Sequence, residues 1–333
     1  MKSPAPPPLP TPRLLLPRPL RGVFFGTSTF AVPALHAFAA EVDCAFVVTQ
    51  PDRPAGRGQR LQATPAKVAA AELGIPTLEP EHPRELAATL RSAPTDLFAL
   101  ASYGKIVPRA LLALPQIAAL NVHPSLLPLY RGATPLQAQI FDGVVQSGVT
   151  IIAMDAGIDT GDIVLQHDAR IGPRETYGEV HDRFARLGAE MLAEACRQAA
   201  RGALARTPQA VAGRETEVER TMTPPLGKAD LVVDWTWPAR RVVDKVRSLS
   251  PGPLARASFG DETCKLIAVH EALPPEGDST AAAAGSMLEG PALRVACGDG
   301  AVVVDRLIAP NRGETSGAVY AARRVRAMRP LSR

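Results

Sequence analysis

An asparagine and a histidine lie two residues apart at the end of an apolar run. Residues 117–120 read Ile-Ala-Ala-Leu and lead into Asn121, Val122 and His123. Side chains alternate between the two faces of a β-strand, so Asn121 and His123 would point to the same side. Pro124 lacks the N–H that a central strand needs, so the strand is expected to end before it. An amide and an imidazole would then lie together at the carboxyl end of a strand, where open α/β sheets bind their ligands.

A carboxylate on a glycine-flanked loop can complete this polar cluster. Asp159 lies in the sequence Gly-Ile-Asp-Thr-Gly-Asp, residues 157–162. The amide of Asn121 and a ring N–H of His123 are suitable donors to the oxyanion that forms when an amine attacks a formyl or amide carbonyl. A neighbouring carboxylate would favour the charged imidazolium, and it could take the proton of the amine directly or through water. The sequence has no Gly-x-Ser-x-Gly elbow, which favours direct group transfer over a covalent enzyme intermediate.

Simpler roles for these residues remain open at this point. The chain has six histidines, and a histidine at a strand end is more often a hydrogen-bonded or surface residue than a catalyst. Asp159 and Asp162 could equally be turn residues of a glycine-rich loop. Whether the three side chains meet in space decides between these interpretations.

Strands and helices alternate through the first two thirds of the chain, which predicts a parallel, doubly wound sheet with right-handed crossovers. The expected strands before the cluster are residues 22–25, 45–48, 97–101 and 117–122, and the expected helices are 30–40, 65–73 and 84–91. After the cluster we expect a helix at 134–141, strands at 149–154 and 163–166, and a long helix at 176–201. The last two strands would flank the Asp159 loop as a hairpin-like pair.

The last third of the chain is predicted to form a second domain. Residues 207–225 lack an apolar period and end in Thr-Pro-Pro, which is typical of a linker. Beyond them, short apolar runs with glycine and proline turns predict a small OB-like β-barrel that contains one helix. The expected strands are 230–234, 254–259, 265–269, 293–297 and 302–308, and the expected helix is 238–248.

Composition limits the class of protein. A chain of 333 residues suits two domains, and its formal net charge of +4 is compatible with an anionic partner without requiring one. The four cysteines are far apart, which argues against a zinc ribbon or a disulfide framework and fits a reducing cytoplasm. No apolar run approaches the roughly 20 residues of a membrane span, so no membrane association is expected. Residues 1–20 hold eight prolines and are expected to be a disordered extension.

Three motifs resemble those of 10-formyltetrahydrofolate-dependent formyltransferases. They are Asn-x-His-x-Ser-Leu-Leu-Pro at 121–128, Arg-Gly-Ala-x-Pro at 131–135 and Asp-x-Gly-x-Asp-Thr-Gly-Asp at 155–162. The resemblance implies a Rossmann-like catalytic domain with a mostly parallel sheet at 21–206, and an OB-like, tRNA-binding domain at 226–333 after the linker. It also implies that the catalytic residues are Asn121, His123 and Asp159.

The same resemblance implies a folate co-substrate and no metal. The formyl donor is expected to be 10-formyltetrahydrofolate. By the motif, the segment that lines the folate site is expected to be Ser125, Leu126, Leu127 and Pro128. Tyr103 follows another expected strand at the same edge of the sheet, so it is expected to line the pteridine pocket.

The loop after the second strand narrows the choice of substrate that accepts the formyl group. Residues 50–58 read Gln-Pro-Asp-Arg-Pro-Ala-Gly-Arg-Gly, which is similar to the family members that formylate initiator methionyl-tRNA. By this likeness Arg53 reaches the end of the acceptor stem. Arg57 and Arg60 make the loop more basic, and arginine contacts to phosphate give affinity and position. The resemblance thus implies a cytoplasmic enzyme of translation initiation, expected to be a monomer. Without the resemblance, a solvated, partly mobile loop is the simpler interpretation of residues 50–58.

Other functions stay open on the sequence alone. Pro124 stands where glycine is usual in the members that act on methionyl-tRNA, and Leu129-Tyr130 stands where Arg-Trp is common. His-Pro-Ser is the form found in related glycinamide ribonucleotide formyltransferases. One rival is therefore a formyltransferase acting on a small amine, either that ribonucleotide or a nucleotide sugar. Others are a non-catalytic tRNA-binding protein and a hydrolase or dehydrogenase acting on the same folate.

Overall fold

The computed structural model of this chain describes residues 19–55, 60–210, 215–272 and 282–328. Most of the expected N-terminal extension and Arg57 lie outside these residues. The chain divides into two compact units. Unit 1 comprises Met1–His123, Thr150–Gln166 and Ala185–Ala210, and unit 2 comprises Pro124–Val149, His167–Phe184 and Val211–Arg333.

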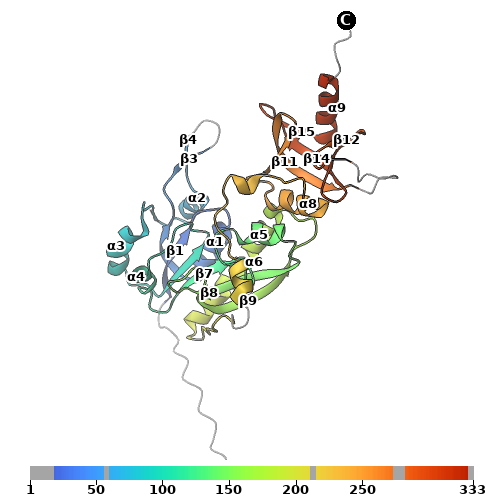
Figure 1. Ribbon diagram of the computed structural model, residues 1–333. Coiled ribbons are helices and arrows are strands. Elements are labelled where there is room, and N and C mark those ends of the chain that lie inside the picture. Colours follow the sequence, from blue (N-terminus) through green and yellow to red (C-terminus); the bar gives the residue numbers. More distant parts are fainter. Residues whose placement is uncertain (1–18, 56–59, 211–214, 273–281, 329–333) are drawn as a thin grey trace, which may run out of the picture. The chain divides into compact units, whose positions relative to one another are not determined.

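A seven-stranded sheet forms the framework of the first part of the chain (Figure 1). Neighbouring strands in the first five positions are parallel, and β7 and β8 are antiparallel. The prediction of a mostly parallel, Rossmann-like sheet is therefore confirmed. In spatial order the strands are β5 (Thr77–Leu78), β2 (Asp43–Val48), β1 (Arg21–Gly26), β6 (Leu97–Ala101), β7 (Ala118–His123), β8 (Gln146–Ala153) and β9 (Asp162–Arg170).

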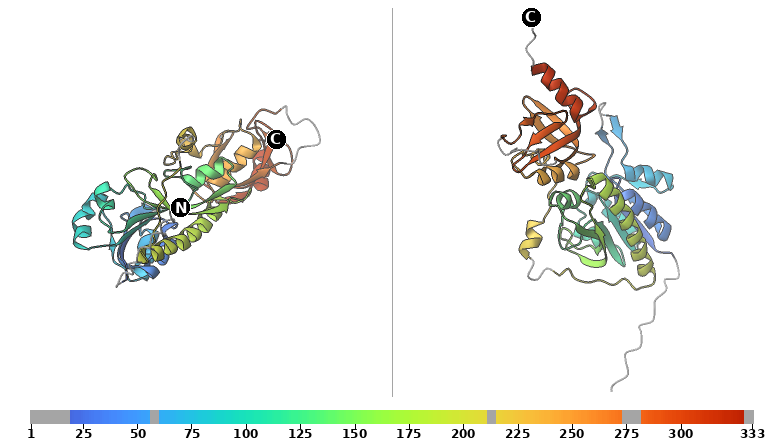
Figure 2. Two further views of the ribbon diagram at one scale, coloured as in Figure 1. Left: turned by 90° about the horizontal axis from the view of Figure 1, so that it is seen from below. Right: turned by 90° about the vertical axis from the view of Figure 1, so that its right-hand side faces the viewer.

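Helices cover the faces of this sheet, because strands buried on both faces are continuous apolar runs that need cover on each side. Strand β6, Leu-Phe-Ala-Leu-Ala, is buried at every residue. The long helix α6 lies beside α1 (Figure 2), where Arg197 and Glu41 form an ion pair at 2.6 Å. The helices are α1 (Ala31–Glu41), α2 (Pro65–Glu72), η1 (Pro83–Leu86), α3 (Ala87–Ser92), α4 (Arg109–Leu112), α5 (Pro135–Phe141) and α6 (Tyr177–Ala200).

The strand order places a topological switch point between β1 and β6. The chain moves from β1 to β2 and β5 on one side, and then returns to β6 and β7 on the other side of β1. The loops that leave β1 and β6 therefore diverge in opposite directions, and this is where open α/β sheets bind ligands. The sheet thus defines the position of the site before any side chain is considered.

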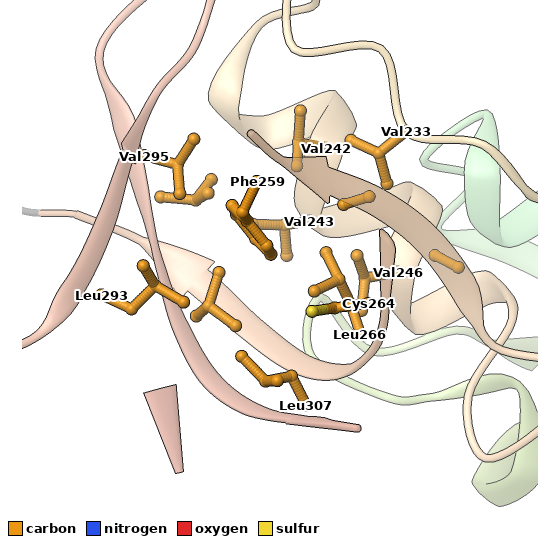
Figure 3. Close-up of a cluster of buried hydrophobic side chains, with 14 of the residues drawn as sticks. Val233, Val242, Val243, Val246, Phe259, Cys264, Leu266, Leu293, Val295 and Leu307 are labelled. Carbon is orange, nitrogen blue, oxygen red and sulfur yellow. The ribbon is translucent and has the colours of Figure 1, made fainter. Parts of the chain in front are cut away.

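A second, antiparallel sheet lies in the C-terminal part of the chain and forms the expected small barrel-type domain. Val242 and Val246 of helix α8 pack with Phe259, Leu266 and Val295 of the strands in one hydrophobic core (Figure 3). The elements are α7 (Glu215–Arg220), η2 (Ala229–Leu231), α8 (Ala239–Ser248), β10 (Ala255–Phe259), β11 (Glu262–Glu271), β12 (Met287–Leu288), β13 (Leu293–Ala296), β14 (Ala301–Ile308), β15 (Glu314–Ser316) and α9 (Gly317–Met328).

One predicted strand is wrong. Residues 230–234 were expected to be extended, but the chain forms the short helix η2 and contributes a single bridge between Val232 and Arg256. The Asp230 carboxylate accepts a hydrogen bond from the Gly227 N–H at 2.8 Å. Such local side-chain bonds compete with a strand ladder, and the apolar run alone did not reveal them.

Several short elements and the C-terminal helix were not predicted. The expected loop after β2 contains a short hairpin of β3 (Arg53–Ala55) and β4 (Arg60–Gln62), which extends away from the sheet (Figure 1). Helix α9 was also not predicted; its Tyr320 hydroxyl donates to Glu262 Oε2 at 2.8 Å. Long-range contacts of this kind stabilise elements whose own sequence pattern is weak. Among the described residues no helix combines the length and apolarity needed to cross a membrane.

Candidate active site

The structure brings the three predicted catalytic side chains together within unit 1. Asn121 and His123 lie on the same face of β7, and Asp159 lies on the loop between β8 and β9. The Asn121 Nδ2 donates to Asp159 Oδ1 at 3.3 Å, and His123 Nδ1 lies 3.5 Å from Asp159 Oδ2. Each oxygen of a single carboxylate therefore faces a different side chain of the strand.

Burial strengthens the electrostatics of this cluster. The side chain of His123 is 4% exposed and that of Asp159 is 13% exposed. Charges interact more strongly where water is excluded. Both contacts are longer than ordinary hydrogen bonds, as catalytic contacts often are before substrate binds. The arrangement can thus hold a substrate oxygen near the two N–H donors while a carboxylate stays beside them.

The Asp159 loop is built so that its turn does not depend on the Asp159 carboxylate. Asp155 Oδ1 accepts from the Gly157 N–H at 3.0 Å and from the Thr160 hydroxyl at 2.6 Å. A side chain at Gly161 would place its Cβ 2.0 Å from the Ala153 carbonyl oxygen. Asp155 therefore forms the turn, and the Asp159 carboxylate faces the polar cluster.

Gln209 contacts this loop, and sequence reasoning did not single it out. Its Nε2 donates to the main-chain oxygens of Asp159 and Gly161, each at 2.8 Å. Two residues earlier, Thr207 exchanges main-chain hydrogen bonds of 2.8 and 2.9 Å with Ile163 at the start of β9. A glutamine in an expected linker carries no sequence signal, so the contact emerges only from the structure.

Small polar groups line the switch point between β1 and β6. The Thr27 hydroxyl and the Gln50 Nε2 both donate to the Tyr103 carbonyl oxygen, at 2.8 and 2.9 Å. The hydroxyls of Ser28 and Ser102 are 2.7 Å apart, and Ser102 has a φ of 45°. Sequence reasoning missed these side chains, although their position after two neighbouring strands is a usable signal.

The Tyr103 side chain lies in the hydrophobic core. Its ring packs edge-on against Phe25 with the centroids 5.6 Å apart. Among the described residues its buried hydroxyl has no hydrogen-bond partner, and burial raises the pKa of Tyr103 to about 12. A role for Tyr103 at the pteridine remains a prediction, and its main chain is the part that lies at the sheet edge.

The predicted folate-lining segment, residues 125–128, and the proline before it are held by hydrogen bonds within unit 2. Ser125 is fully buried, and its hydroxyl donates to the Leu129 carbonyl oxygen at 2.7 Å. The buried Gln139 of α5 donates to the Pro124 carbonyl oxygen at 2.9 Å. These bonds give the segment a defined shape. Gln139, like Gln209, is a supporting residue that the sequence did not indicate.

Arg53, the predicted tRNA contact, is paired with an acid on the neighbouring loop. Its Nη2 lies 2.9 Å from Glu81 Oε2, and both side chains are about 60% exposed. Lys105 donates to the carbonyl oxygens of Pro80 and Glu81 at 2.8 and 2.6 Å. A phosphate that binds Arg53 would therefore replace Glu81. The side chain of Arg60, like Arg57, lies outside the described residues.

A second ionic group fixes the base of the hairpin. The Lys67 ammonium lies 3.0 Å from Asp52 and 2.9 Å from Glu79. Hydrogen bonds to Glu79 and Asp52 raise the pKa of Lys67 above its ordinary value. Within the described ranges no group of three or more His, Cys, Asp or Glu side chains is placed to hold a metal ion.

Comparison with known families agrees with the two-domain fold. A model described as formyl transferase matches residues 21–196, and one described as formyl transferase, C-terminal domain, matches residues 225–325. The two matches together define a two-domain formyl transferase.

Curated relatives make the assignment more specific. The methionyl-tRNA formyltransferase of Aromatoleum aromaticum is 43% identical over 251 residues, which are 74% of this chain and 78% of the relative. The enzyme of the same name from Anaeromyxobacter dehalogenans is 41% identical over 293 residues, 86% and 90% of the two chains. The chain belongs to the family of methionyl-tRNA formyltransferases.

Solved structures share the fold at low identity. An N-formyltransferase from Helicobacter canadensis, in complex with folinic acid and dTDP-3-aminofucose, has a TM-score of 0.63 and 16% identity over 86% of this chain and 98% of its own. HypX from Aquifex aeolicus has a TM-score of 0.59 and 17% identity over 93% of this chain and 48% of its own. At such identities the likeness establishes the fold alone.

Proposed function

We propose that this chain transfers the formyl group of 10-formyltetrahydrofolate to the α-amino group of initiator methionyl-tRNA. The observation that carries the proposal is the trio of Asn121, His123 and Asp159, in which one largely buried carboxylate lies within 3.5 Å of both an amide and an imidazole. The acceptor follows from family membership and from the names of the relatives, 36–43% identical to this chain.

The trio suits each part of the reaction. The amine nitrogen attacks the formyl carbon, the bond from that carbon to the donor nitrogen breaks, and the donor nitrogen takes up a proton as tetrahydrofolate leaves. N–H groups of Asn121 and His123 would donate to the oxygen that gains charge during the attack. One such donor is worth about 2.7–4 kcal/mol of barrier in measured cases. Asp159 would take the proton that the amine loses, directly or through water.

The residues proposed to bind the donor follow from the family motif and from their local structure. Ser125, Leu126, Leu127 and Pro128 are proposed to line the folate site, supported by the family motif and by the rigid shape that Gln139 gives the segment. Tyr103 would contribute through its main chain, because its ring is buried in the core. The chemistry of the proposed site uses no metal.

The acceptor end of the tRNA would contact the β3–β4 hairpin. The exposed guanidinium of Arg53 is proposed to bind phosphate, with Arg57 and Arg60 adding positive charge to the same hairpin. A small amine needs no such extension, and this is the feature that favours tRNA over a nucleotide sugar or glycinamide ribonucleotide. The reaction places the enzyme in the cytoplasm with the translation machinery, and we propose that it acts there as a monomer.

A comparison of acceptors tests this function. The purified full chain is mixed with 10-formyltetrahydrofolate and, separately, with charged initiator methionyl-tRNA, glycinamide ribonucleotide or an amino nucleotide sugar. We expect rapid formylation of methionyl-tRNA and at least about 100-fold lower kcat/KM on the small amines, because a small amine lacks the phosphate contacts that position the tRNA. Formylation of a small amine with none of methionyl-tRNA would overturn the assignment, and activity lost in Asn121→Ala would exclude a non-catalytic binding protein.

A further inference from the structure

We infer that Gln209 is a positioning residue of the formyl-transfer site, which holds the Asp159 loop against the strand that carries Asn121 and His123. This inference deepens the proposed function and rests on it for the role of Asp159. Gln209 lies between the residues matched by the two family models, 21–196 and 225–325. The stretch that was expected to be a linker would thereby belong to the catalytic machinery.

The hydrogen bonds of Gln209 determine the orientation of its amide. Two of its contacts are carbonyl oxygens of the main chain, those of Asp159 and Gly161, and each lies 2.8 Å from Nε2. Carbonyl oxygens only accept, so the NH₂ side of the amide must face them, and each of its two N–H groups can serve one oxygen. One side chain thus fixes two points of the loop on either side of Thr160.

The loop needs an external restraint to keep this shape. Residues 155–158 are exposed, and Ile158 is 53% exposed, so little packing holds them. Asp159 itself has a φ of 52°, in the left-handed region, which aspartate enters more often than most residues other than glycine but which is still uncommon and is stabilised by support from the surroundings. Donors to the oxygens of Asp159 and Gly161 supply that restraint.

Gln209 is itself anchored. Thr207, two residues earlier, is paired with Ile163 by two main-chain hydrogen bonds of 2.8 and 2.9 Å. Residues two apart on an extended segment point the same way, so this pairing sets the place from which the Gln209 side chain reaches the loop. Catalytic groups must be held within about 0.5 Å of their productive positions, which requires support of this kind.

The test uses three substitutions with different hydrogen-bonding ability. Gln209→Met keeps the length but donates nothing, Gln209→Glu presents a carboxylate to two carbonyl oxygens, and Gln209→Lys retains donors. We expect kcat to fall about 10- to 100-fold for methionine, since a 1 Å misplacement costs on the order of 100-fold. The loss should be greater for glutamate and smaller for lysine, with KM for both substrates changed less than threefold. Gln198→Glu on α6, a glutamine whose amide contacts Glu194 at 3.2 Å, is the matched control and should keep wild-type kcat.

A readout without substrate separates this inference from the proposed function. The ¹⁵N resonances of the His123 imidazole should move in Gln209→Met toward those of Asp159→Asn, because the carboxylate is no longer held beside the ring. If wild type fails to formylate methionyl-tRNA yet this shift occurs, the function is wrong and the positioning role stands. If folded Gln209→Met and Gln209→Glu keep kcat within twofold and unchanged His123 resonances, the positioning role is refuted. Should Gln209→Met not fold, the comparison of the other two variants decides: a higher kcat for Gln209→Lys than for Gln209→Glu supports the positioning role, and equal kcat values refute it.

Discussion

Truncation of Asn121 should separate catalysis from stability. In Asn121→Ala the amide that would donate to the formyl oxygen is lost, and one oxyanion donor is worth about 2.7–4 kcal/mol, or 100- to 1,000-fold in kcat. The structural cost is smaller, because the bond from Asn121 to Asp159 is long at 3.3 Å. A hydrogen bond contributes about 0.5–1.5 kcal/mol to folding, and a long one should lie at the lower end of that range. The rate should therefore fall far more than the fraction of folded protein.

Single-turnover formylation measures this directly. Enzyme in excess over methionyl-tRNA, with saturating 10-formyltetrahydrofolate, gives the rate of the chemical step, and urea unfolding of the same preparations gives the stability. Asn121→Asp is the companion variant: it has the same size, but an acceptor replaces the donor and a charge is added beside Asp159, so its rate should be lower still. A single-turnover rate within fivefold of wild type in Asn121→Ala would refute the donor role.

Four further substitutions probe other parts of the proposed site. Arg53→Ala should weaken tRNA binding and lower the slope of log K against log salt by about 0.9 for each lost phosphate contact. Glu81→Gln should tighten tRNA binding by up to about fivefold, since exposed ion pairs contribute at most about 1 kcal/mol. Filter binding at several salt concentrations would detect either change. Gln139→Glu should raise the Kd of 5-formyltetrahydrofolate, because an ionised carboxylate repels the Pro124 carbonyl oxygen to which the Gln139 amide donates. Calorimetry at pH 8 measures this Kd, and an unchanged value would contradict the prediction. Tyr103→Phe should preserve kcat and stability at pH 8, because the buried hydroxyl has no partner in the described part of the chain. Burial raises the pKa of Tyr103 to about 12 in the folded protein, against about 10 in the unfolded chain. Its contribution to stability is therefore present below pH 10 and lost as the pH rises through 12. In urea unfolding, wild type should lose stability between pH 9 and pH 11, and Tyr103→Phe should lose less.

The positions of the two proposed catalytic residues on β7 could be predicted because they depend on local sequence. The apolar run before Asn121 and the proline after His123 define a strand and its end, and the alternation of side chains on a strand places the pair on one face. Asp159 required more, since its approach depends on the pairing of β7 with β8 and on the loop that follows β8. The family motifs supplied that link where periodicity could not.

The supporting residues could not be predicted, because their partners are main-chain atoms far away in the sequence. Gln209 binds carbonyl oxygens 50 and 48 positions earlier in the chain, and every residue has such an oxygen, so no residue type marks the partner. The β3–β4 hairpin was missed for a related reason: its strands are three residues long, too short for any alternation to be read. Short-range patterns predict what a segment prefers, and long-range contacts decide the remainder.

The central claim is that the trio promotes direct passage of a formyl group from folate to methionyl-tRNA. The most direct test uses a donor labelled with ¹³C in its formyl group. The full chain is bound to this donor and then mixed rapidly with charged initiator tRNA. The account predicts labelled formyl-methionine on the tRNA within one turnover, no label covalently attached to the protein at any time, and loss of the signal in His123→Ala. Covalent labelling of the protein, or a donor consumed without formylation of the tRNA, would contradict it.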